Sequence, residues 1–525
     1  MGAYSPSNAA NSNSVEISGG TVKSYIAGGY GTSANNNSVV LSGGTISTEY
    51  VYGGCALTDE SNNNTITLTN TVDVSQTSLY GSNMNVENAT GNTLVIDKWT
   101  SSNEKGNVIN SVQNFNAITF KNLPWKTDGV ALDITNAETT GELSHTTVDV
   151  ENLSLSGGTT LQAGDTMTFI RSNLDTGLSL DNISVTEDPT FTQGVSAVGE
   201  LDMKLDGETN NLIGEIKGIA RNPQTDLIAE NRAVAAAFVN QGADIAAESL
   251  DLMSDDYKYG VRTFGAVYGS RSKYDVNSDL KINGWNTIVG VGNVHRKGDA
   301  NLAWGVFYEN GTGNYRTENS FNDEFFRGDG SLVYNGGGAA VRYKKDSGAY
   351  YEASLRVGTL NSSMSNAVRD GEGNSYGYDS DSTYWGTHLG VGKLIQSGSG
   401  QWNVYGKYFH TEVEGDNFSI AGDEFSFDDV TSDRLRLGAR YTADTDKDWS
   451  LYYGLAWEYE FNGDSNMKAG QFDAPEQSLQ GSTGIAEIGT VWRSDDSPWR
   501  ADINLKGYTG EREGFSGMVH LTYLF

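Results

Sequence analysis

The sequence predicts an all-β protein: an N-terminal right-handed parallel β-helix, one Ala-rich linker helix and a C-terminal twelve-stranded antiparallel transmembrane β-barrel. Three observations predict it, namely a repeat within the first 70 residues, one long helical stretch, and amphipathic segments throughout the last half. The 525 residues include 64 glycines and 6 prolines, which suits strands and turns better than helix bundles. The predicted divisions are a repetitive β-helix over 1–150, its cap over 151–221, the helix over 222–254 and the barrel over 255–525.

A repeat with a period of about 25 residues occupies residues 11–70. Asn13–Val22 is echoed by Asn37–Ile46, and more loosely by Asn64–Val72. Each copy fits one rung of a parallel β-helix, in which alternate Val, Ile and Leu side chains stack inward and each rung buries its apolar edge against its neighbours. A β-sandwich with recurring Ser-Gly-Gly turns is the alternative.

Strand-like segments continue from residue 94 to 218, although the period is lost. The densest of them spans residues 153–170. The open end of a solenoid exposes unpaired backbone groups and apolar edges, so it needs a terminal cap. Because residues 151–221 are the last before the helical stretch, we expect them to form that cap.

One long helical stretch begins at Asn222-Pro223 and continues to Met253. Asn suits the N-cap and Pro suits the first helical position, and the body is rich in Ala. Its charged side chains make contact with lipid costly, so we expect the helix to thread the barrel lumen. A linker helix packed on a soluble domain is the alternative. The residues predicted to lie in the lumen are Asn222, Pro223, Asp226, Glu230, Arg232 and Asn240.

Amphipathic segments with one aromatic-rich face fill residues 257–525. Between residues 449 and 461 every second residue is large and apolar, and Phe515–Phe525 alternates similarly. About twelve such segments, most of ~9–11 residues, predict a transmembrane barrel, whose closure leaves no unpaired strand edge in lipid. Between the strands, short turns alternate with polar stretches that we expect to be long external loops, namely 311–330, 415–431 and 463–480.

The faces opposite the aromatic residues carry charges of both signs. These charges are expected to line a polar lumen, where they could form ion pairs with each other and with the threaded helix. The predicted lumen charges are Arg434, Arg436, Arg440, Glu458, Glu460 and Arg500. A soluble antiparallel β protein with one wet face is the alternative.

Taken in order, the β-helix, the cap, the Ala-rich helix and the barrel ending in Phe525 resemble a type Va autotransporter of the adhesin-like kind. The pattern from Leu155 to Asp165 resembles the autochaperone region of that family. The final five residues resemble the signal read by the barrel-assembly machinery, with Leu521, Tyr523 and Phe525 as its signal residues. The resemblance extends over essentially the whole chain.

The resemblance implies an outer-membrane protein of a Gram-negative bacterium that translocates its own passenger and anchors it at the cell surface. Its implied partners are outer-membrane lipid and lipopolysaccharide, the barrel-assembly machinery and periplasmic chaperones, and a host or bacterial surface receptor or a second copy of itself. Family members begin with a signal peptide, which Met1–Tyr4 does not show. We therefore expect a processed or incomplete N-terminus.

Some relatives release the passenger by cyclisation of an Asn in the helix that is followed by a second Asn. Here Asn231 precedes Arg232 and Asn240 precedes Gln241, so the Asn-Asn pair is missing. We expect the passenger to stay attached, with self-cleavage at Asn240 as the alternative.

Composition narrows the chemistry of the passenger. The net charge of −32 argues against nucleic acid, which needs a basic surface. His145 is the only histidine before the helix and Cys55 the only cysteine, so neither a Ser-His-Asp triad nor a Cys/His zinc site is expected. We expect no enzyme activity and no cofactor. The passenger is predicted to act in adhesion or self-association through repeated weak contacts, and the alternative is a surface glycan-acting enzyme delivered in the same way.

Overall fold

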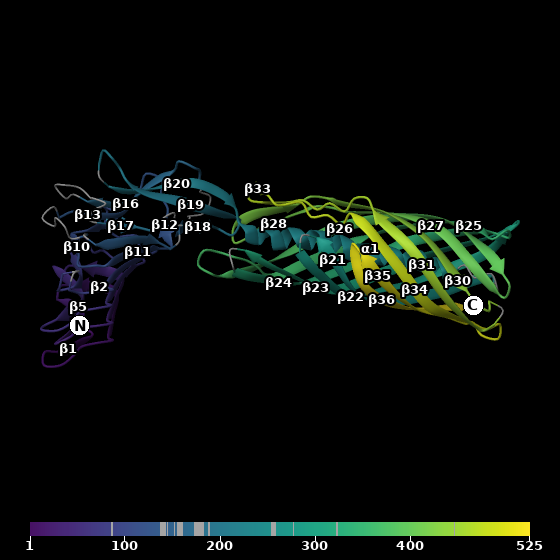
Figure 1. Cartoon of the computed structure of the whole chain (residues 1–525), viewed down its shortest axis with the longest axis horizontal. Coiled ribbons are helices and arrows are strands. Elements are labelled where there is room, and N and C mark those ends of the chain that lie inside the picture. Colours follow the sequence, from purple (N-terminus) through teal and green to yellow (C-terminus); the bar gives the residue numbers. More distant parts are fainter. Residues whose placement is uncertain are drawn as a thin grey trace. The chain divides into compact units, whose positions relative to one another are not determined.

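The computed structural model of the 525-residue chain describes every residue outside positions 86–87, 137–142, 144, 152, 155–160, 173–182, 187–189, 210, 254–258, 277, 322–323 and 446. Two compact units are present, Met1–Asn222 with Asp370–Asn374, and Pro223–Arg369 with Ser375–Phe525. The first is a β-solenoid and the second is a closed barrel that holds one helix (Figure 1). The predicted all-β fold class is confirmed.

Two parallel sheets form walls of the solenoid. The five-stranded sheet has the order β1 (Ala3–Ser5), β3 (Ile26–Gly31), β5 (Tyr50–Ala56), β7 (Ser78–Ser82) and β10 (Ser111–Gln113). The seven-stranded sheet contains, in spatial order, β17 (Ile183–Val185), β14 (Thr146–Val150), β11 (Ala117–Lys121), β8 (Thr93–Asp97), β6 (Thr65–Thr69), β4 (Ser38–Ile46) and β2 (Ser14–Val22). Corresponding strands of successive repeats pair in parallel, so the β-sandwich alternative is wrong.

Alternate apolar residues of the repeat face inward, as the sequence predicts. Val39 and Leu41 of β4 stack on Ile66 and Leu68 of β6, and all four side chains are fully buried. Burial of side chains of this size stabilises each by roughly 1.5–3 kcal/mol relative to exposure. The core of the solenoid is therefore a column of aliphatic residues shared between successive rungs.

The Asn that opens each repeat forms a second column. The backbone N–H of Asn37 donates to Oδ1 of Asn64 at 3.0 Å, and the N–H of Asn64 donates to Oδ1 of Asn92 at 2.9 Å. The same bond joins Asn13 to Asn37 and Asn92 to Asn116. Each Asn thus satisfies a turn N–H of the preceding rung, which explains why the repeat begins with this residue.

Antiparallel strands end the solenoid. In the third sheet β9 (Val108–Ile109), β13 (Val130–Ile134) and β16 (Thr166–Ser172) pair in parallel. The strands β20 (Leu212–Arg221), β19 (Ala197–Leu205) and β18 (Thr190–Gln193) then continue it antiparallel. A two-stranded sheet pairs β12 (Leu123–Pro124) with β15 (Leu153–Ser154). Residues 155–160 of the autochaperone-like pattern lie outside the described residues.

Twelve antiparallel strands close into a barrel, because β36 pairs with β21. They are β21 (Gly260–Val276), β22 (Ser278–Lys297), β23 (Ala300–Phe321), β24 (Glu324–Lys345), β25 (Ala349–Arg369), β26 (Ser375–Ser397), β27 (Gly400–Val413), β30 (Val430–Thr442), β31 (Trp449–Glu460), β34 (Gly481–Arg493), β35 (Trp499–Gly510) and β36 (Arg512–Leu524). Closure pairs the edge strands β21 and β36 with each other, so the predicted transmembrane barrel has no unpaired strand edge.

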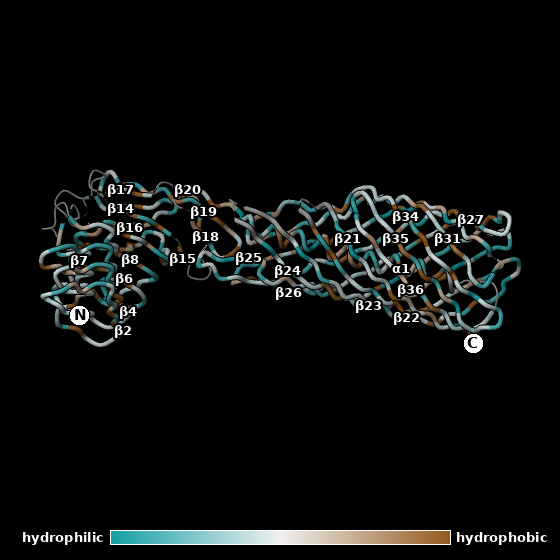
Figure 2. Tube along the Cα trace, turned by 60° about the horizontal axis from the view of Figure 1, so that its bottom comes forward, coloured by the Kyte–Doolittle hydropathy of each residue, from teal (hydrophilic) through white to brown (hydrophobic). Residues whose placement is uncertain are grey.

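The two faces of the barrel wall differ in polarity. Hydrophilic and hydrophobic residues are interspersed along the barrel strands in Figure 2. On β31, Leu455 is 72% exposed on the outer face, whereas Glu458 and Glu460 are buried toward the lumen. On β36, Phe515, Val519 and Leu521 are exposed, and His520 and Thr522 are buried. The predicted alternation therefore assigns aromatic and aliphatic residues to the outside and polar residues to the lumen.

The predicted external loop at 311–330 is wrong. This stretch continues β23 and β24, which stay paired up to Phe321 and Glu324. It is polar on its outer face, as at Arg316, and it carries several glycines, so its composition resembles a loop although its period remains two. The other two polar stretches contain a separate sheet of short strands, namely β28 (Asp416–Ile420), β29 (Asp423–Phe427), β32 (Met467–Ala469) and β33 (Phe472–Asp473).

In the described segments of the chain one α-helix is present, α1 (Asp226–Met253), and it follows the short 3-10 helix η1 (Pro223–Thr225). It runs inside the barrel and packs against β21–β27, β30 and β36 (Figure 1). Every side chain from Leu227 to Ala247 is buried. Within the described part of the chain, no helix has both the length and the apolar character needed to cross a membrane.

Candidate functional site: the barrel lumen

Asp244 of α1 is the centre of one lumen cluster. Its Oδ1 lies 2.8 Å from Nη2 of Arg436 and 3.1 Å from Nη1 of Arg434, and its Oδ2 lies 3.5 Å from Nη1 of Arg512. Glu458 on β31 binds Arg436 at 2.6 Å and Arg434 at 3.4 Å. All five side chains are buried, so these ion pairs join the helix to three strands in a region screened from water.

A second cluster lies near the C-terminal end of α1. Asp251 binds Arg342 at 2.6 Å and lies 3.7 Å from Arg440. Glu352 contacts Arg342 and lies 2.8 Å from Nζ of Lys407. The helix therefore ends between strands β24, β25, β27 and β30 with its last acidic residue paired to barrel cations.

Lys506 and Glu487 extend this second cluster toward β34 and β35. Nζ of Lys506 donates to Glu248 of α1 and lies 3.9 Å from Glu487. Glu487 in turn accepts from Nε of Arg440 at 2.8 Å. Cations of the wall thus meet three acidic residues of α1, Asp244, Glu248 and Asp251, along one side of the lumen.

The middle of the helix fits closely against the wall at Gly242. A Cβ at this position would lie 2.4 Å from the hydroxyl oxygen of Tyr334 and 2.5 Å from Nη2 of Arg356. Arg356 donates from Nη1 to the carbonyl of Val239 at 2.8 Å, and it is paired with Glu309 at 3.0 Å. Glycine is therefore required here for close approach of helix and wall.

Arg232 anchors the N-terminal part of α1 to loops at one end of the barrel. Its Nη1 donates to Oγ of Ser382 at 2.9 Å, and its Nη2 donates to the carbonyl oxygens of Val413, Glu414 and Asp428. The guanidinium also stands 5.3 Å from the ring centre of Phe427. The segments around residues 413–428 are thus tied to the helix.

The structure distributes the other predicted lumen residues unequally. Glu230 is buried in the lumen, and Asn240 donates from Nδ2 to Oγ of Ser432 at 2.9 Å. Pro223 opens η1, and Asp226 is the first residue of α1 and is half-buried. Asn222 belongs to the first unit, where its Nδ2 donates to the carbonyl of Val195 at 3.0 Å.

Two predicted lumen charges have mainly local partners. Glu460 accepts from Oγ of Ser432 at 2.5 Å and from the N–H of Asp433 at 2.8 Å. Arg500 donates to the carbonyl oxygens of Ser494 at 2.7 Å and Ser497 at 3.2 Å. Arg500 therefore stabilises the turn between β34 and β35.

Sequence reasoning missed part of the network. Arg342 lies between the exposed Val341 and the outward-facing Tyr343, and Arg356 lies between the exposed Leu355 and Val357. The period-two rule would have placed both arginines in the lumen if it had been applied to these strands. The missed lumen charges are Asp251, Glu309, Arg342, Glu352, Arg356, Lys407, Glu487 and Arg512.

The lumen arrangement holds a helix by ion pairs. Among the described residues no group of three or more His, Cys, Asp or Glu side chains could hold a metal ion. The carboxylates of the Asp244 and Glu487 clusters face arginine and lysine. This geometry fixes α1 inside the pore, and α1 is the segment that follows the first unit in the sequence.

Residues 263–505 match the family model described as Autotransporter beta-domain. The chain is similar to the β-domain of the Bordetella autotransporter BrkA, with 13% identity, 51% of this chain and 100% of that chain covered, and a TM-score of 0.41. The translocator domain of NalP from Neisseria meningitidis is 16% identical, with 56% of this chain and 99% of that chain covered and a TM-score of 0.41. The transport unit of AIDA-I from Escherichia coli is 14% identical, with 58% of this chain and 99% of that chain covered and a TM-score of 0.44.

No curated protein sequence matches the chain. The family match covers eleven of the twelve strands of the closed barrel, from β21 into β35. This chain therefore carries an autotransporter β-domain, an outer-membrane barrel that translocates a passenger and holds it at the cell surface.

Proposed function

We propose that the solenoid is an adhesive passenger, which binds other cells or a second copy of itself while the barrel anchors it. One observation carries this proposal: on the five-stranded sheet, tyrosine side chains of neighbouring rungs stack in two separate pairs. Tyr4 stacks on Tyr30 with ring centres 5.2 Å apart, and Tyr52 stacks on Tyr80 at 4.9 Å. Tyr4 is 63% exposed.

Stacked tyrosine pairs suit contact surfaces. Tyrosine provides a large and rigid side chain with a polar tip, at a low cost in conformational entropy, and it is enriched at protein interfaces. Burial raises the pKa of Tyr25 and Tyr52 above the ordinary value of a tyrosine. Two such pairs on one sheet support several weak contacts acting together, which is how avidity arises from modest single affinities.

The carboxylates of the passenger support adhesion over glycan hydrolysis. Asp133 is paired with Arg171 at 2.5 Å, and Asp97 accepts from Nδ2 of Asn122 at 3.1 Å. Asp73 accepts from the backbone N–H of Ser75 at 3.0 Å. Glycoside hydrolysis needs two carboxyl groups facing one bond, and these three groups instead have separate structural partners. We therefore propose a passenger without enzyme activity.

The C-terminal strand supports a further part of this proposal, recognition by the barrel-assembly machinery. Leu521 is 45% exposed and Phe525 is 75% exposed, on the same outer face as Tyr523. Apolar side chains in this position are available to a partner before the strand closes the barrel. Periplasmic chaperones are proposed to hold the chain until then.

Surface display in a bacterium that neither aggregates nor adheres tests the adhesive function. The wild-type chain should cause settling of the cells or binding to host cells, and the double variant Tyr52→Ser with Tyr80→Ser should lose most of it. Val40→Ser with Val95→Ser changes two partly exposed side chains on the other sheet and should behave like the wild type. Release of sugars from a glycan panel without any adhesion would favour the enzyme alternative.

A further inference from the structure

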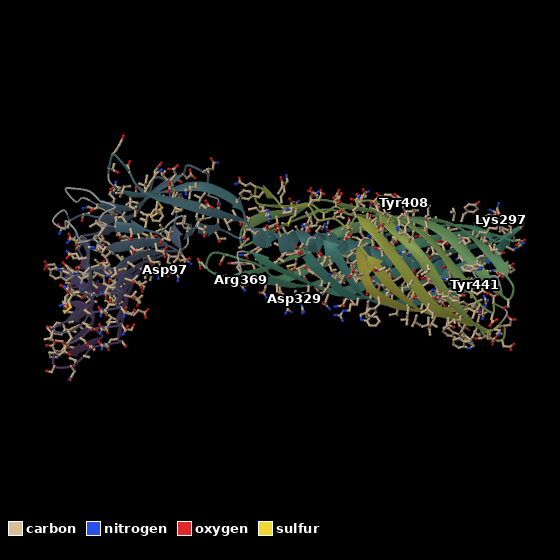
Figure 3. The ribbon with its side chains drawn as sticks, viewed as in Figure 1. Asp97, Lys297, Asp329, Arg369, Tyr408 and Tyr441 are labelled. Carbon is tan, nitrogen blue, oxygen red and sulfur yellow. The ribbon has the colours of Figure 1, made fainter. Side chains whose placement is uncertain are left out.

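The tyrosines of the first unit lie on or beside one wall of the solenoid. All six occur within the first 80 residues of the chain, and residues 81–222 contain none. Five belong to strands β1, β3, β5 and β7 of the five-stranded sheet, and Tyr25 directly precedes β3. The seven described strands of the other sheet contain no tyrosine, and Asp97 at the end of β8 marks that sheet in Figure 3. The phenols are therefore gathered on one wall.

The parallel register places tyrosines of successive strands beside each other. Tyr52 of β5 pairs with Tyr80 of β7, and their rings stack with centres 4.9 Å apart and planes 27° apart. Tyr4 of β1 pairs with Tyr30 of β3, and these ring centres are 5.2 Å apart. Because neighbouring strands are spaced by ~4.8 Å, the backbone itself holds each pair of phenols together. Each pair thus joins one rung of the solenoid to the next.

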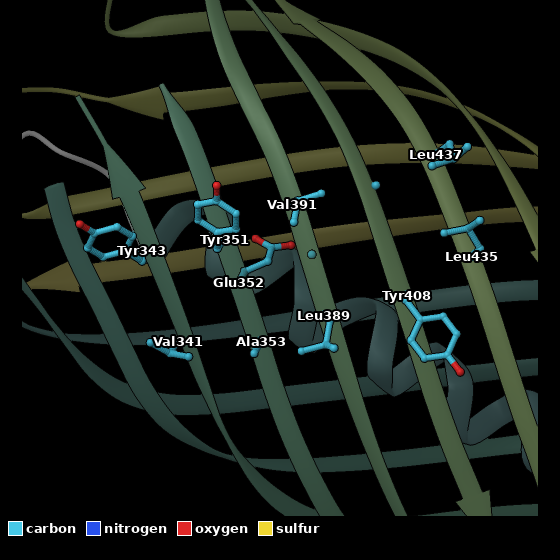
Figure 4. A pocket seen from close by; sticks show the side chains of 12 residues that line it. Val341, Tyr343, Tyr351, Glu352, Ala353, Leu389, Val391, Tyr408, Leu435 and Leu437 are labelled. Carbon is cyan, nitrogen blue, oxygen red and sulfur yellow. The ribbon is translucent and has the colours of Figure 1, made fainter. Parts of the chain in front are cut away.

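An in-register pair of tyrosines in the barrel provides a comparison within the same molecule. Tyr343 of β24 pairs with Tyr351 of β25, and both line a hollow of 640 Å³ on the outer wall. Their rings point in different directions in Figure 4. Register alone therefore does not stack two tyrosine rings, and the stacking of Tyr52 on Tyr80 is an additional feature of the solenoid sheet.

Two further rings extend the Tyr52–Tyr80 pair into a cluster. The ring centre of Tyr50 lies 5.9 Å from that of Tyr80 and 6.3 Å from that of Tyr52. The ring centre of Tyr25 lies 5.5 Å from that of Tyr52. Tyr25 and Tyr50 are each 37% exposed, whereas Tyr52 and Tyr80 are partly buried. A reagent in solution therefore reaches this tyrosine cluster through its two exposed members.

Tyr50 has a proton acceptor in place. Its hydroxyl donates to Oε1 of Glu49, and both side chains are exposed. A phenol that loses one electron becomes a strong acid and gives up its proton, so a hydrogen-bonded carboxylate makes that loss easier. Tyr50 is therefore the member of the tyrosine cluster best prepared to lose an electron to an external oxidant, and its ring contacts lead from there to Tyr52 and Tyr80.

We propose that Tyr52 and Tyr80 are a site of oxidative cross-linking, at which hydrogen peroxide and an external haem peroxidase join two rungs covalently. Each phenol loses one electron and one proton. One ortho carbon of each ring then forms a carbon–carbon bond, and the hydrogens on these two carbons move to the phenolic oxygens. The peroxide takes up the two electrons and two protons and is reduced to two water molecules. The rings need only rotate about their side-chain torsions, since their centres are already 4.9 Å apart.

The cross-link closes one turn of the solenoid into a covalent ring. Such a ring restricts the unfolded chain in the way that a disulfide does. Cys55 is the only cysteine of the chain, so an internal disulfide is not available for this purpose. The proposal requires a passenger that external oxidants reach, and it is independent of the adhesive function.

Oxidation of the full chain, purified in mild detergent, tests the proposal. A Cys55→Ser background removes the thiol, which peroxide would otherwise oxidise. After treatment with hydrogen peroxide and a haem peroxidase, mass spectrometry of the digested protein should show a peptide pair joined through residues 52 and 80. This pair should be lighter by two hydrogen masses than the separate peptides. Absence of this link overturns the proposal, and so does a link between Tyr343 and Tyr351 in the same yield.

Isotope labelling shows whether the bond forms within one chain. Labelled and unlabelled copies of the full chain are mixed before oxidation. The two peptides of the 52–80 link should carry the same label, because the stacked rings belong to one solenoid. Links that combine the two labels as often as chance allows would show coupling between copies and would contradict the proposed site.

Phenylalanine variants keep the ring and its stacking but remove the phenol. Tyr80→Phe should lose the link, and Tyr50→Phe should lower its yield several-fold because the entry point with its proton acceptor is gone. Tyr351→Phe, in the barrel, should leave the yield unchanged. Equal yields in the last two variants would contradict the role of Tyr50.

Proteolysis measures the consequence of the bond. The oxidised parent protein should lose its passenger to protease about tenfold more slowly than oxidised Tyr80→Phe, since the covalent ring opposes local opening. The same two proteins without oxidation should be cut at equal rates. Equal rates after oxidation would show that the bond does not stabilise the solenoid.

Discussion

Asp244 of α1 lies 2.8 Å from Arg436 and 3.1 Å from Arg434, so one carboxylate of the helix holds two arginines of β30. The carboxylate and both guanidinium groups are shielded from water, because all three residues are buried. Removal of the carboxylate would leave two buried cations to share Glu458. The contact therefore ties the position of the helix to the stability of the barrel.

Asp244→Asn should destabilise the full chain by about 3 kcal/mol, since loss of one partner leaves buried charge uncompensated. The temperature at which the barrel loses the gel mobility of its folded form measures this loss of stability. Asp346→Asn is the matched control, because it breaks an exposed pair with Arg296 and should cost at most ~1 kcal/mol. If the unfolding temperature falls equally in the two variants, the buried lumen pair contributes no more to stability than the exposed pair.

Gly242→Ala should also destabilise the barrel, although alanine favours helix formation by about 1 kcal/mol over glycine. The added methyl would overlap Tyr334 and Arg356, and overpacking of this kind costs about 1–3 kcal/mol. Gly507→Ala on β35 meets nothing within 4 Å and should be neutral. Unfolding in denaturant compares the two, and a G242A variant as stable as the wild type would mean that the helix does not sit against this wall.

Asn64→Ala should weaken the solenoid by about 1–3 kcal/mol, because the buried N–H of Asn37 then lacks an acceptor. Asn62→Ala, in the same rung, removes the acceptor of the more exposed N–H of Thr90, where water can replace it. Hydrogen exchange of β4 and β6 in the full chain should rise in the first variant and change little in the second. Similar exchange in both would contradict a role for the inner Asn column.

Phe525→Ser should lower the amount of assembled barrel in the outer membrane while the passenger fold is little affected. Phe515→Ser removes a side chain of similar exposure, 61% against 75%, inside β36, which ends at Leu524 just before Phe525. This variant should assemble nearly normally. Cell fractionation, together with the gel mobility of the folded form, measures the amount of assembled barrel for both variants. If both serine variants reach the wild-type level, Phe525 is not part of an assembly signal.

The sequence was most informative where one rule applied over many residues. The outward aromatic face of residues 449–461 followed from period two, and the inward Val39 and Leu41 followed from the repeat. The stretch 311–330 was misjudged because polar residues on both faces and several glycines hide the same period. A polar composition indicates a loop only where the period-two alternation of a strand is absent.

The partners inside the lumen could not be deduced from the sequence. Every side chain of α1 from Leu227 to Ala247 is buried, so the helix has no polar stripe that would show which wall each residue faces. Asp244 and Glu248 meet residues about 190 to 260 positions later in the chain. Arg500 obeyed the alternation, but only its surroundings show that it binds turn carbonyls.

A disulfide cross-link in living cells tests the central claim, that the helix occupies the barrel while the passenger is outside. In a Cys55→Ser background, Asn240→Cys with Ser432→Cys places two thiols where Nδ2 and Oγ are now 2.9 Å apart. The control pair joins Asn240→Cys with Ser450→Cys, on another strand. The account predicts that the first pair alone cross-links, and that external protease removes the passenger while the helix stays bonded to the barrel. An absent bond in the first pair, or a passenger that protease cannot reach on intact cells, would contradict it.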